Sequence, residues 1–119
     1  MKTIIAGSRD IVDYTLVCDA IQQSGFEITE VISGAARGVD LSGEIWAKEN
    51  HIPVKQFFAQ WEERGRFAGY IRNAEMVDYA DALIAITNGS RGTAHTIDLA
   101  NKKGIKVFVL NVDTYKNIT

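Results

Sequence analysis

The sequence predicts an α/β fold: a three-layer, Rossmann-like domain with a five-stranded parallel sheet in the order 3-2-1-4-5. The first observation behind this prediction is the regular alternation of short apolar, β-branched runs with stretches of helical spacing. The second is that the runs at residues 3–6 and 82–87 are continuous, as in strands buried on both faces. The third is a glycine-rich turn after three of the runs. Strands that alternate with helices form right-handed crossovers, which build a parallel sheet.

The first unit of this pattern is a strand at residues 3–6 followed by a helix at 11–24. We expect Asp10 to cap this helix and Gly25 to end it. Its apolar positions, which follow helical spacing, are Val12, Leu16, Val17, Ala20 and Ile21.

The remaining elements repeat this unit. We expect strands at residues 27–33, 52–58, 82–87 and 105–110, helices at 39–50, 66–79 and 93–103, and a loop at 60–65. Residues 1–111 form one domain in this prediction, and residues 112–119 form a C-terminal tail. In the order 3-2-1-4-5, strands one and four splay apart at their carboxyl ends, and a ligand-binding crevice opens between them.

Length and composition fit a single globular domain, with 119 residues of which 46% are hydrophobic. The formal net charge of -2 argues against nucleic acid or a membrane surface as a partner. No apolar run is long enough to span a bilayer. The single cysteine excludes an internal disulfide, and the N-terminus lacks the features of a secretory signal. We therefore expect a cytoplasmic protein.

Three glycine-rich turns, at residues 7–9, 34–38 and 88–93, are the best candidates for a binding site. A turn that runs into a helix exposes backbone N–H groups and the positive end of the helix dipole, which bind phosphates and carboxylates. Because all three turns open at one edge of the predicted sheet, we expect a single site for a nucleotide-type small molecule. The predicted ligand-binding residues are Gly7, Ser8, Arg9, Gly34, Ala35, Arg37, Gly38, Asp40, Arg72, Asn73, Met76, Asn88, Gly89, Ser90, Gly92 and Thr93.

These turns lack the motifs of the common nucleotide-binding loops. None has the Gly-Lys-Ser/Thr of a P-loop and none is a complete G-x-G-x-x-G, so we expect no dinucleotide cofactor. With two histidines, one cysteine and no paired carboxylates at ligand spacing, we expect no metal site. Ser8 and Ser90 have no obvious serine-histidine-acid arrangement.

Charged side chains near the turns allow two interpretations. The guanidinium groups of Arg9, Arg37, Arg72 and Arg91 suit phosphate or carboxylate. A solvated surface position is an equally good interpretation for Arg9, Arg37 and Arg91, whereas for Arg72 we favour a role in the site. Asp40 either interacts with the N-terminus of its own helix or binds ribose hydroxyls or a base amine. Arg72 and Asp40 are also the candidate catalytic residues.

Two interpretations also remain for the aromatic residues near the predicted site. Trp61 and Phe67 either stack on a base or pack against the domain, whereas Trp46 is expected in the core. His95 lies near a helix N-terminus, which disfavours the imidazolium form, so we expect a neutral hydrogen-bond partner. Glu75 and Asp98 are expected on the helix surfaces.

Four segments together resemble the SLOG superfamily of Rossmann-like domains. They are residues 32–40 (ISGAARGVD), 65–76 (GRFAGYIRNAEM), 80–85 (ADALIA) and 89–93 (GSRGT). This superfamily includes the LOG cytokinin-activating phosphoribohydrolases and the DNA-processing protein DprA. The chain looks like the small, stand-alone YspA-type branch found in bacteria and their phages, and the resemblance extends to about residue 110.

The resemblance implies binding of nucleotides or nucleotide-derived signals. LOG enzymes cleave the N-glycosidic bond of a nucleoside monophosphate, using an Arg on the helix before strand four and a Glu after a Gly-Gly-x-Gly-Thr turn. Arg72 matches that arginine, with Asn73 and Met76 beside it. In the turn, Gly89, Gly92 and Thr93 match and Ser90 replaces the second glycine.

The acidic pair that follows the turn in LOG enzymes falls on His95 and Thr96, so the catalytic Glu is missing. A carboxylate is needed to stabilise an oxocarbenium-like transition state or to activate water. The resemblance therefore supports a nucleotide pocket and argues against the LOG reaction.

Three functions follow as hypotheses. The first is a non-catalytic sensor or sequestering protein for a nucleotide or nucleotide-derived signal. The second is a nucleotide hydrolase acting on an N-glycosidic or phosphate bond, with Asp40 or Glu75 in place of the missing Glu. The third is a DNA-binding module by analogy with DprA, which the net charge of -2 disfavours. The resemblance also implies a homo-oligomer, in which Arg66 or Tyr70 serves a neighbour's site.

Overall fold

Strands and helices alternate along most of the chain in the computed structural model, which describes residues 1–113. In chain order the elements are β1 (Lys2–Gly7), α1 (Tyr14–Ser24), β2 (Glu30–Ser33), α2 (Val39–Glu49), β3 (Val54–Gln56), α3 (Trp61–Arg64), the 3-10 turn η1 (Gly65–Phe67), α4 (Ala68–Tyr79), β4 (Ala82–Thr87), α5 (Arg91–Lys103) and β5 (Lys106–Asn111).

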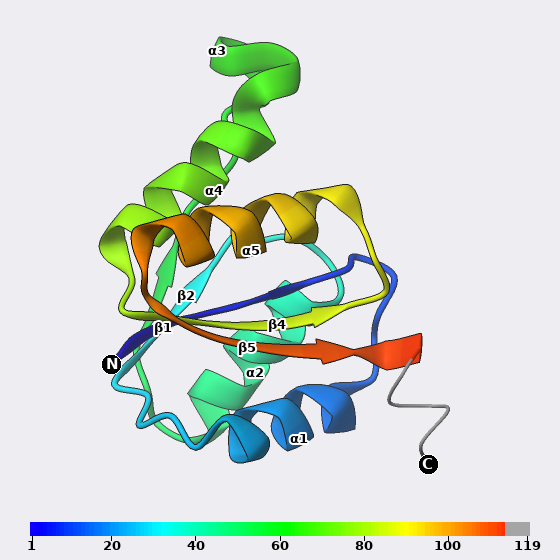
Figure 1. Ribbon diagram of the computed structural model, residues 1–119, viewed down its shortest axis with the longest axis vertical. Helices are drawn as coiled ribbons and strands as arrows, with labels where there is room; N and C mark the ends of the chain where they lie inside the picture. The colour runs from blue at the N-terminus through cyan, green and yellow to red at the C-terminus, as the bar shows by residue number, and fades with distance from the viewer. Residues whose placement is uncertain (114–119) are drawn as a thin grey trace.

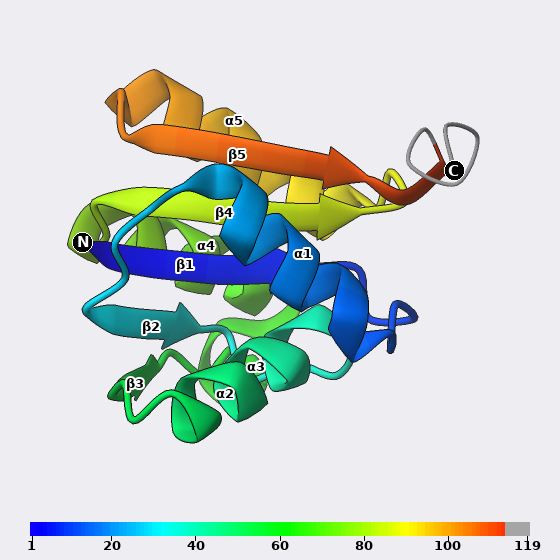
Figure 2. The ribbon, with the colours of Figure 1, turned by 90° about the horizontal axis from the view of Figure 1, so that it is seen from below.

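The five strands form one parallel sheet in the order β3-β2-β1-β4-β5, which confirms the predicted fold class and strand order. Helices α1 and α2 cover one face, and α4 and α5 cover the other, so the domain has three layers (Figures 1 and 2). Each of the inner strands contributes alternate side chains to the two faces, and both faces are buried. Ile5, Val31, Ile84, Ile86 and Leu110 belong to the α1–α2 side, and Ile4, Ala6, Ile32, Leu83 and Ala85 to the α4–α5 side.

The helices that follow the neighbouring strands β1 and β4 lie on opposite faces of the sheet. The chain after β1 passes to α1 on one face, and the chain after β4 passes to α5 on the other, although the two strands are neighbours. Their carboxyl ends, paired at Gly7 and Ile86, therefore bound the point where the strand order reverses.

The start of α1 differs from the prediction. The helix is capped by Asp13, whose Oδ1 accepts a hydrogen bond of 3.0 Å from the Thr15 N–H. Asp10 lies earlier in the turn and accepts from the Asn88 side-chain amide instead. Val12, predicted on the apolar face of this helix, precedes it and is 78% exposed. As predicted, Gly25 ends the helix, in the left-handed conformation with φ of 68°.

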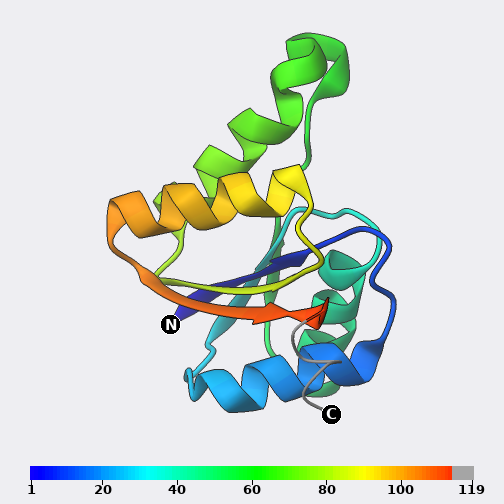
Figure 3. The same cartoon turned by 45° about the vertical axis from the view of Figure 1, so that its right-hand side comes forward.

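The segment predicted as a loop at residues 60–65 contains the short helix α3. The Gln60 carbonyl accepts from the N–H groups of Glu63 and Arg64, and two glutamates in the first turn favour a helix there. With η1 and the beginning of α4, this helix projects away from the sheet (Figure 3). The regular α-helix consequently starts at Ala68, two residues later than predicted.

Of the predicted tail at residues 112–119, the structure describes two residues. Val112 is 5% exposed and packs in the core cluster on the α1 side, and residues 114–119 lie outside the described part of the chain. Within residues 1–113, no helix combines the length and the apolar character that crossing a bilayer requires.

Candidate functional site

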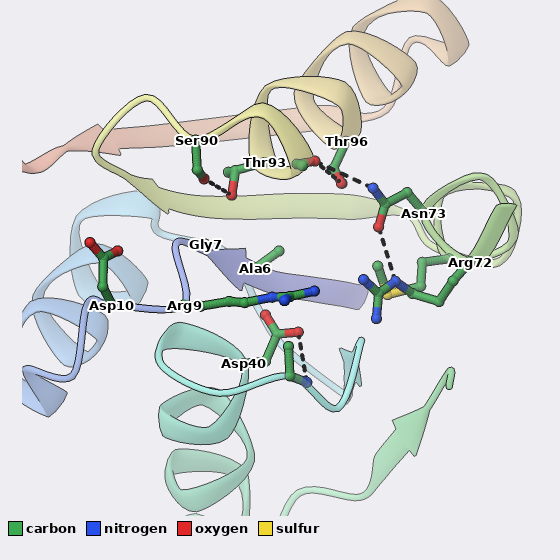
Figure 4. Close-up of a pocket in the computed structure, with 13 residues that line it drawn as sticks. Ala6, Gly7, Arg9, Asp10, Asp40, Arg72, Asn73, Ser90, Thr93 and Thr96 are labelled. Atoms are coloured by element: carbon green, nitrogen blue, oxygen red, sulfur yellow. Dashed lines mark hydrogen bonds between the residues drawn. The ribbon is translucent and has the colours of Figure 1, made fainter. Parts of the chain in front are cut away.

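A pocket of about 320 Å³ lies at the carboxyl ends of β1 and β4, where the strand order reverses (Figure 4). This is the place where open α/β sheets bind their ligands, and the volume lies at the lower end of the range for small-molecule sites. Its lining comes from β1 and the turn after it, the turn before α2, and the facing sides of α4 and α5. The lining residues are Ala6, Gly7, Arg9, Asp10, Ala36, Asp40, Arg72, Asn73, Met76, Ser90, Gly92, Thr93 and Thr96.

The floor of the pocket is formed by Ala6 and Gly7 at the end of β1. A Cβ at Gly7 would lie 2.1 Å from the Ile86 carbonyl oxygen and 2.6 Å from Val39 Cγ2, so only glycine fits between β4 and α2. Gly38 shows a similar close approach on the turn before α2, since its φ is +74° and a Cβ would lie 2.6 Å from the Ser8 carbonyl oxygen.

The α5 wall presents the N-terminus of a helix. The first N–H groups of an α-helix have no partner inside the helix, and Gly92 and Thr93 belong to this first turn and line the pocket. The Ser90 hydroxyl donates to Thr93 Oγ1 at 3.0 Å, which brings two hydroxyl groups to the same place. A Cβ at Gly92 would meet no atom within 4 Å, so the backbone here is open to the pocket.

The α4 wall carries Arg72, whose guanidinium group joins three segments of the chain. Nε donates to the Asn73 side chain at 3.0 Å, and Nη1 donates to the Gly34 carbonyl oxygen. The Asn73 amide in turn donates to the Gly92 carbonyl oxygen and lies 3.3 Å from His95 Nδ1. These bonds connect α4 to the turn after β2 and to α5.

Two positive charges face each other across the pocket. Burial lowers the pKa of the Arg72 guanidinium, the negative charge of Asp40 opposes this effect, and the nearby positive charge of Arg9 adds to it. Arg9 is exposed and extends over the pocket toward Arg72 (Figure 4). Such a pair of guanidinium groups favours an anion between them.

Asp40 is a buried carboxyl group in the first turn of α2, only 6% exposed. Burial raises its pKa to about 6, and the nearby charge of Glu44 acts in the same direction. The N–H groups of Ala36 and Gly7 and the charge of Arg72 oppose the rise. The carboxyl group therefore changes its charge near neutral pH while facing the pocket (Figure 4).

A second cavity of about 280 Å³ adjoins the first and shares Arg9, Ala36 and Arg72 with it. Its remaining lining comes from the turn after β2 and from the segment between β3 and α3, and consists of Gly34, Ala35, Arg37, Phe58, Ala59 and Trp61.

The structure brings most of the predicted site residues together. Gly7, Arg9, Asp40, Arg72, Asn73, Met76, Ser90, Gly92 and Thr93 line the first cavity, and Gly34, Ala35 and Arg37 line the second. Four predicted residues line neither cavity: Ser8, Gly38, Asn88 and Gly89.

Ser8 and Asn88 instead join the turn after β1 to the turn after β4, outside the lining of either cavity. Ser8 is 1% exposed, and its hydroxyl donates to Asn88 Oδ1 at 2.7 Å, accepts from the Asn88 N–H and lies 3.0 Å from Ser90 Oγ. Gly89 supplies a backbone conformation with φ of +97°. The aromatic residue Phe67 and the cation Arg91 also lie outside both linings, while Trp46 packs at the margin of the core.

Sequence reasoning missed several lining residues, namely Ala6, Asp10, Ala36, Phe58, Ala59 and Thr96. Ala36 belongs to the predicted glycine-rich turn at residues 34–38, so it could have been included among the predicted ligand-binding residues. Thr96 lies one helical turn after Gly92, to whose carbonyl oxygen its hydroxyl donates, and helical spacing alone could have found it. Phe58 follows an edge strand, and no pattern in the sequence places it near the site.

No group of three or more His, Cys, Asp or Glu side chains within the described residues has an arrangement that could hold a metal ion. The polar chemistry of the site is that of arginines, hydroxyl groups, a helix N-terminus and Asp40.

The comparisons with known proteins point to one family. The family model described as the YspA, cpYpsA-related SLOG family matches residues 1–63. The gene 61 protein of Mycobacterium phage D29 is 36% identical over 117 residues, an alignment that covers 89% of this chain and 93% of the phage protein.

Among solved structures, the DNA processing protein A (DprA) of Streptococcus pneumoniae has the same fold, with a TM-score of 0.75 at 18% identity. That similarity covers 91% of this chain and 49% of DprA, so the chain spans about half the length of the DprA chain. From the family match and the extent of the phage similarity, the chain belongs to the YspA, cpYpsA-related SLOG family.

Proposed function

We propose that the protein binds a nucleotide or nucleotide-derived signal through its phosphate group and acts as a sensor or sequestering protein without turning the ligand over. The observation that carries this proposal is the gathering of positive groups around one pocket. Arg9 and Arg72 face each other across it, and the N-terminus of α5 lines it with Ser90 and Thr93. A phosphate group placed there would meet charge-assisted donors from both arginines and from α5.

We propose that the protein does not catalyse the LOG reaction because the carboxylate which that reaction requires is missing. The LOG reaction needs a carboxylate after the turn before α5, and His95 and Thr96 stand at those positions. The Thr96 hydroxyl donates to the Gly92 carbonyl oxygen within the helix, and His95 lies beside the Asn73 amide. Neither side chain replaces a carboxylate in stabilising a developing positive charge.

Binding is tested by isothermal titration calorimetry with inorganic phosphate, ribose 5-phosphate, nucleoside monophosphates, cyclic nucleotides and ADP-ribose. Arg9→Ala is the informative variant, because Arg9 is exposed and we expect its loss to change stability little. We expect affinity to fall roughly tenfold or more when this charged donor is removed. Arg64→Ala, which removes the same charge from α3 outside both cavities, is the matched control. Failure of every compound to bind the wild type would contradict the proposal.

A second candidate, a nucleotide hydrolase, is favoured by one observation: Asp40, with its pKa raised to about 6, lines the pocket next to Arg72. A carboxyl group that titrates near the working pH suits general acid or base catalysis. Glu75, the other predicted substitute for the missing Glu, is exposed on α4 and lines neither cavity. Chromatography of nucleoside monophosphates incubated with the protein would reveal free base or free phosphate, which must disappear with Asp40→Asn.

A further inference from the structure

The second cavity has an aromatic wall that the proposed phosphate site does not use. Phe58 and Trp61 both line it, and they are 64% and 52% exposed. They come from different positions in the chain, Phe58 after β3 and Trp61 at the first turn of α3. Large exposed aromatic side chains that converge on one concavity are typical of ligand contacts.

Trp61 lies beside the first turn of α4. A Cβ added to Gly69 of α4 would lie 3.5 Å from Trp61 Cη2 and 3.9 Å from its Cζ2, so the far edge of the indole rests against the first turn of α4. The segment that carries Trp61 projects from the body of the domain (Figure 3). An indole that lies beside a helix with about half of its surface open presents area on which a planar ring can stack.

The rest of the cavity offers polar groups suited to the edge of a ring. Four consecutive residues of the turn after β2, residues 34–37, line it. The N–H groups of Ala35 and Ala36 and the Gly34 carbonyl oxygen are bonded within the protein, and the Arg37 guanidinium is a side-chain donor that this turn presents. Within this turn Ala35 adopts a φ of +59°, a left-handed conformation that a residue with a Cβ rarely takes. Strain of this kind gathers at ligand-binding sites, where the surrounding structure enforces it.

We propose that this second cavity receives the planar base of the nucleotide, stacked on Trp61 and Phe58, while the phosphate lies at the α5 N-terminus. The inference rests on the proposed function and assigns the base a place. Arg9, Ala36 and Arg72 line both cavities and stand at the junction, where the sugar of such a ligand would lie. The ligand class is therefore a compound with a phosphate and an aromatic base, rather than a sugar phosphate.

The first test compares ribose 5-phosphate with AMP, GMP, CMP, UMP and ADP-ribose by isothermal titration calorimetry on the wild-type protein. At least one base-containing compound should bind more tightly than ribose 5-phosphate, by roughly five- to a hundredfold, the range expected of one base–aromatic stack. Equal affinity of all of them for the protein would overturn the inference and leave the proposed phosphate site standing. No binding of any compound, ribose 5-phosphate included, would refute both.

The second test removes the ring faces. Trp61→Leu and Phe58→Leu keep apolar bulk and should abolish the preference for the base while leaving the ribose 5-phosphate affinity unchanged; Trp61→Phe should keep most of it. Phe67→Leu is the matched control, because Phe67 is 55% exposed on the same projecting segment and lines neither cavity. If Trp61→Leu leaves nucleotide affinity unchanged and Arg37→Ala lowers it, the cavity holds a second anion and the inference is wrong.

A third readout reports the stack directly. The chain has two tryptophans, and Trp46→Phe leaves Trp61 as the single indole fluorophore. In this background, titration with the tightest-binding nucleotide should quench the fluorescence of Trp61, and ribose 5-phosphate should not. A nucleotide that binds without changing this emission would contradict stacking on Trp61.

Discussion

The guanidinium group of Arg72 donates a hydrogen bond to the carbonyl oxygen of Gly34, and this bond ties α4 to the turn after β2. The Arg72 side chain also occupies the space next to the Gly34 Cα. A Cβ at Gly34 would lie 2.7 Å from Arg72 Nη1 and 2.8 Å from Asp40 Oδ2. The glycine thereby lets a cation and a carboxyl group approach the same stretch of backbone at the junction of the two cavities.

Gly34→Ala should therefore damage the site more than the fold. The atoms that the new Cβ would meet are the ends of side chains, which can move aside, so we expect stability to fall by about 1 kcal/mol. Moving Arg72 away from its place should lower ligand affinity roughly tenfold or more. Urea denaturation and calorimetric titration measure the two effects.

Gly7→Ala provides the contrast to this prediction. Its Cβ would lie 2.1 Å from the Ile86 carbonyl oxygen, which is backbone in the neighbouring strand and can move only if β1 and β4 separate. We expect a loss of about 3 kcal/mol or more. A smaller stability loss for Gly7→Ala than for Gly34→Ala would contradict this account of the two glycines.

Asp40 should make the protein less stable as the pH rises from about 4 to about 6. Its pKa is raised from 3.8 to about 6 in the folded state, so the folded protein binds a proton that the unfolded chain releases. The stability associated with that proton is complete below pH 4 and lost above about pH 6. Asp40→Asn should consequently be more stable relative to wild type at pH 7 than at pH 4. The difference between the two proteins in the free energy of unfolding should change by on the order of 2–3 kcal/mol between these pH values.

Thermal and urea unfolding of wild type and Asp40→Asn at the two pH values measure this difference. Asp98→Asn is the control, since this carboxylate is exposed on α5 and its surface pair with Lys102 contributes little to stability. A stability difference between wild type and Asp40→Asn that stays constant from pH 4 to pH 7 would show that Asp40 does not titrate in this range.

Ser8→Ala should destabilise the protein by about 1–3 kcal/mol although it removes one oxygen atom. The Ser8 hydroxyl is buried, donates to Asn88 Oδ1 and accepts from the Asn88 N–H. Its loss removes both of these hydrogen bonds, each worth about 0.5–1.5 kcal/mol, although Asn88 itself is exposed. Urea denaturation gives the stability change, and faster hydrogen exchange of the Asn88 amide would locate it. A change below about 0.5 kcal/mol, the range of ordinary surface substitutions, would argue against this role.

Thr93→Val should weaken ligand binding and lower stability by about 1 kcal/mol, the contribution of one hydrogen bond. The substitution keeps the shape of a side chain that is 5% exposed and removes the hydroxyl that accepts from Ser90 at the α5 N-terminus. We expect phosphate-bearing ligands to lose roughly fivefold or more in affinity, the cost of one hydrogen bond. Thr87→Val is the comparison, because the Thr87 side chain is similarly buried, its hydroxyl accepts from the Gly89 N–H, and it lines neither cavity. Equal losses for both variants would show that the effect does not come from a contact with the ligand.

The fold was predictable because its signals are local and repeated. The continuous apolar run at β4 is buried along its whole length, and Gly25 and Gly104 end their helices in the left-handed conformation that glycine favours. The cap of α1 was not predictable in the same way. Asp10 and Asp13 are equally good caps by residue type, and the choice of Asp13 depends on Asp10 meeting Asn88, which lies 78 residues away.

The candidate site was predictable where it consists of backbone turns, and less so where it depends on side-chain direction. Glycine-rich turns after neighbouring strands predict a pocket at the point where the strand order reverses, whatever side chains surround them. The inward position of Ser8 behind the turn comes from its bonds to Asn88, which no local pattern encodes. Phe67 was predicted near the site but lines neither cavity, because η1 projects from the sheet together with α3. Phe58, which follows β3, was not predicted and lines the second cavity.

The packing of Gly7 against Ile86 and Val39 also bears on how such a protein can change its ligand over evolution. Where the floor of a pocket is backbone in contact with backbone, no substitution can reshape it without cost to the sheet. New preferences must then come from the rim, through exposed positions such as Arg37, Phe58 and Trp61, which carry little of the folding energy. Relatives with this floor would keep the same backbone at the bottom of the pocket and differ in the side chains at its rim.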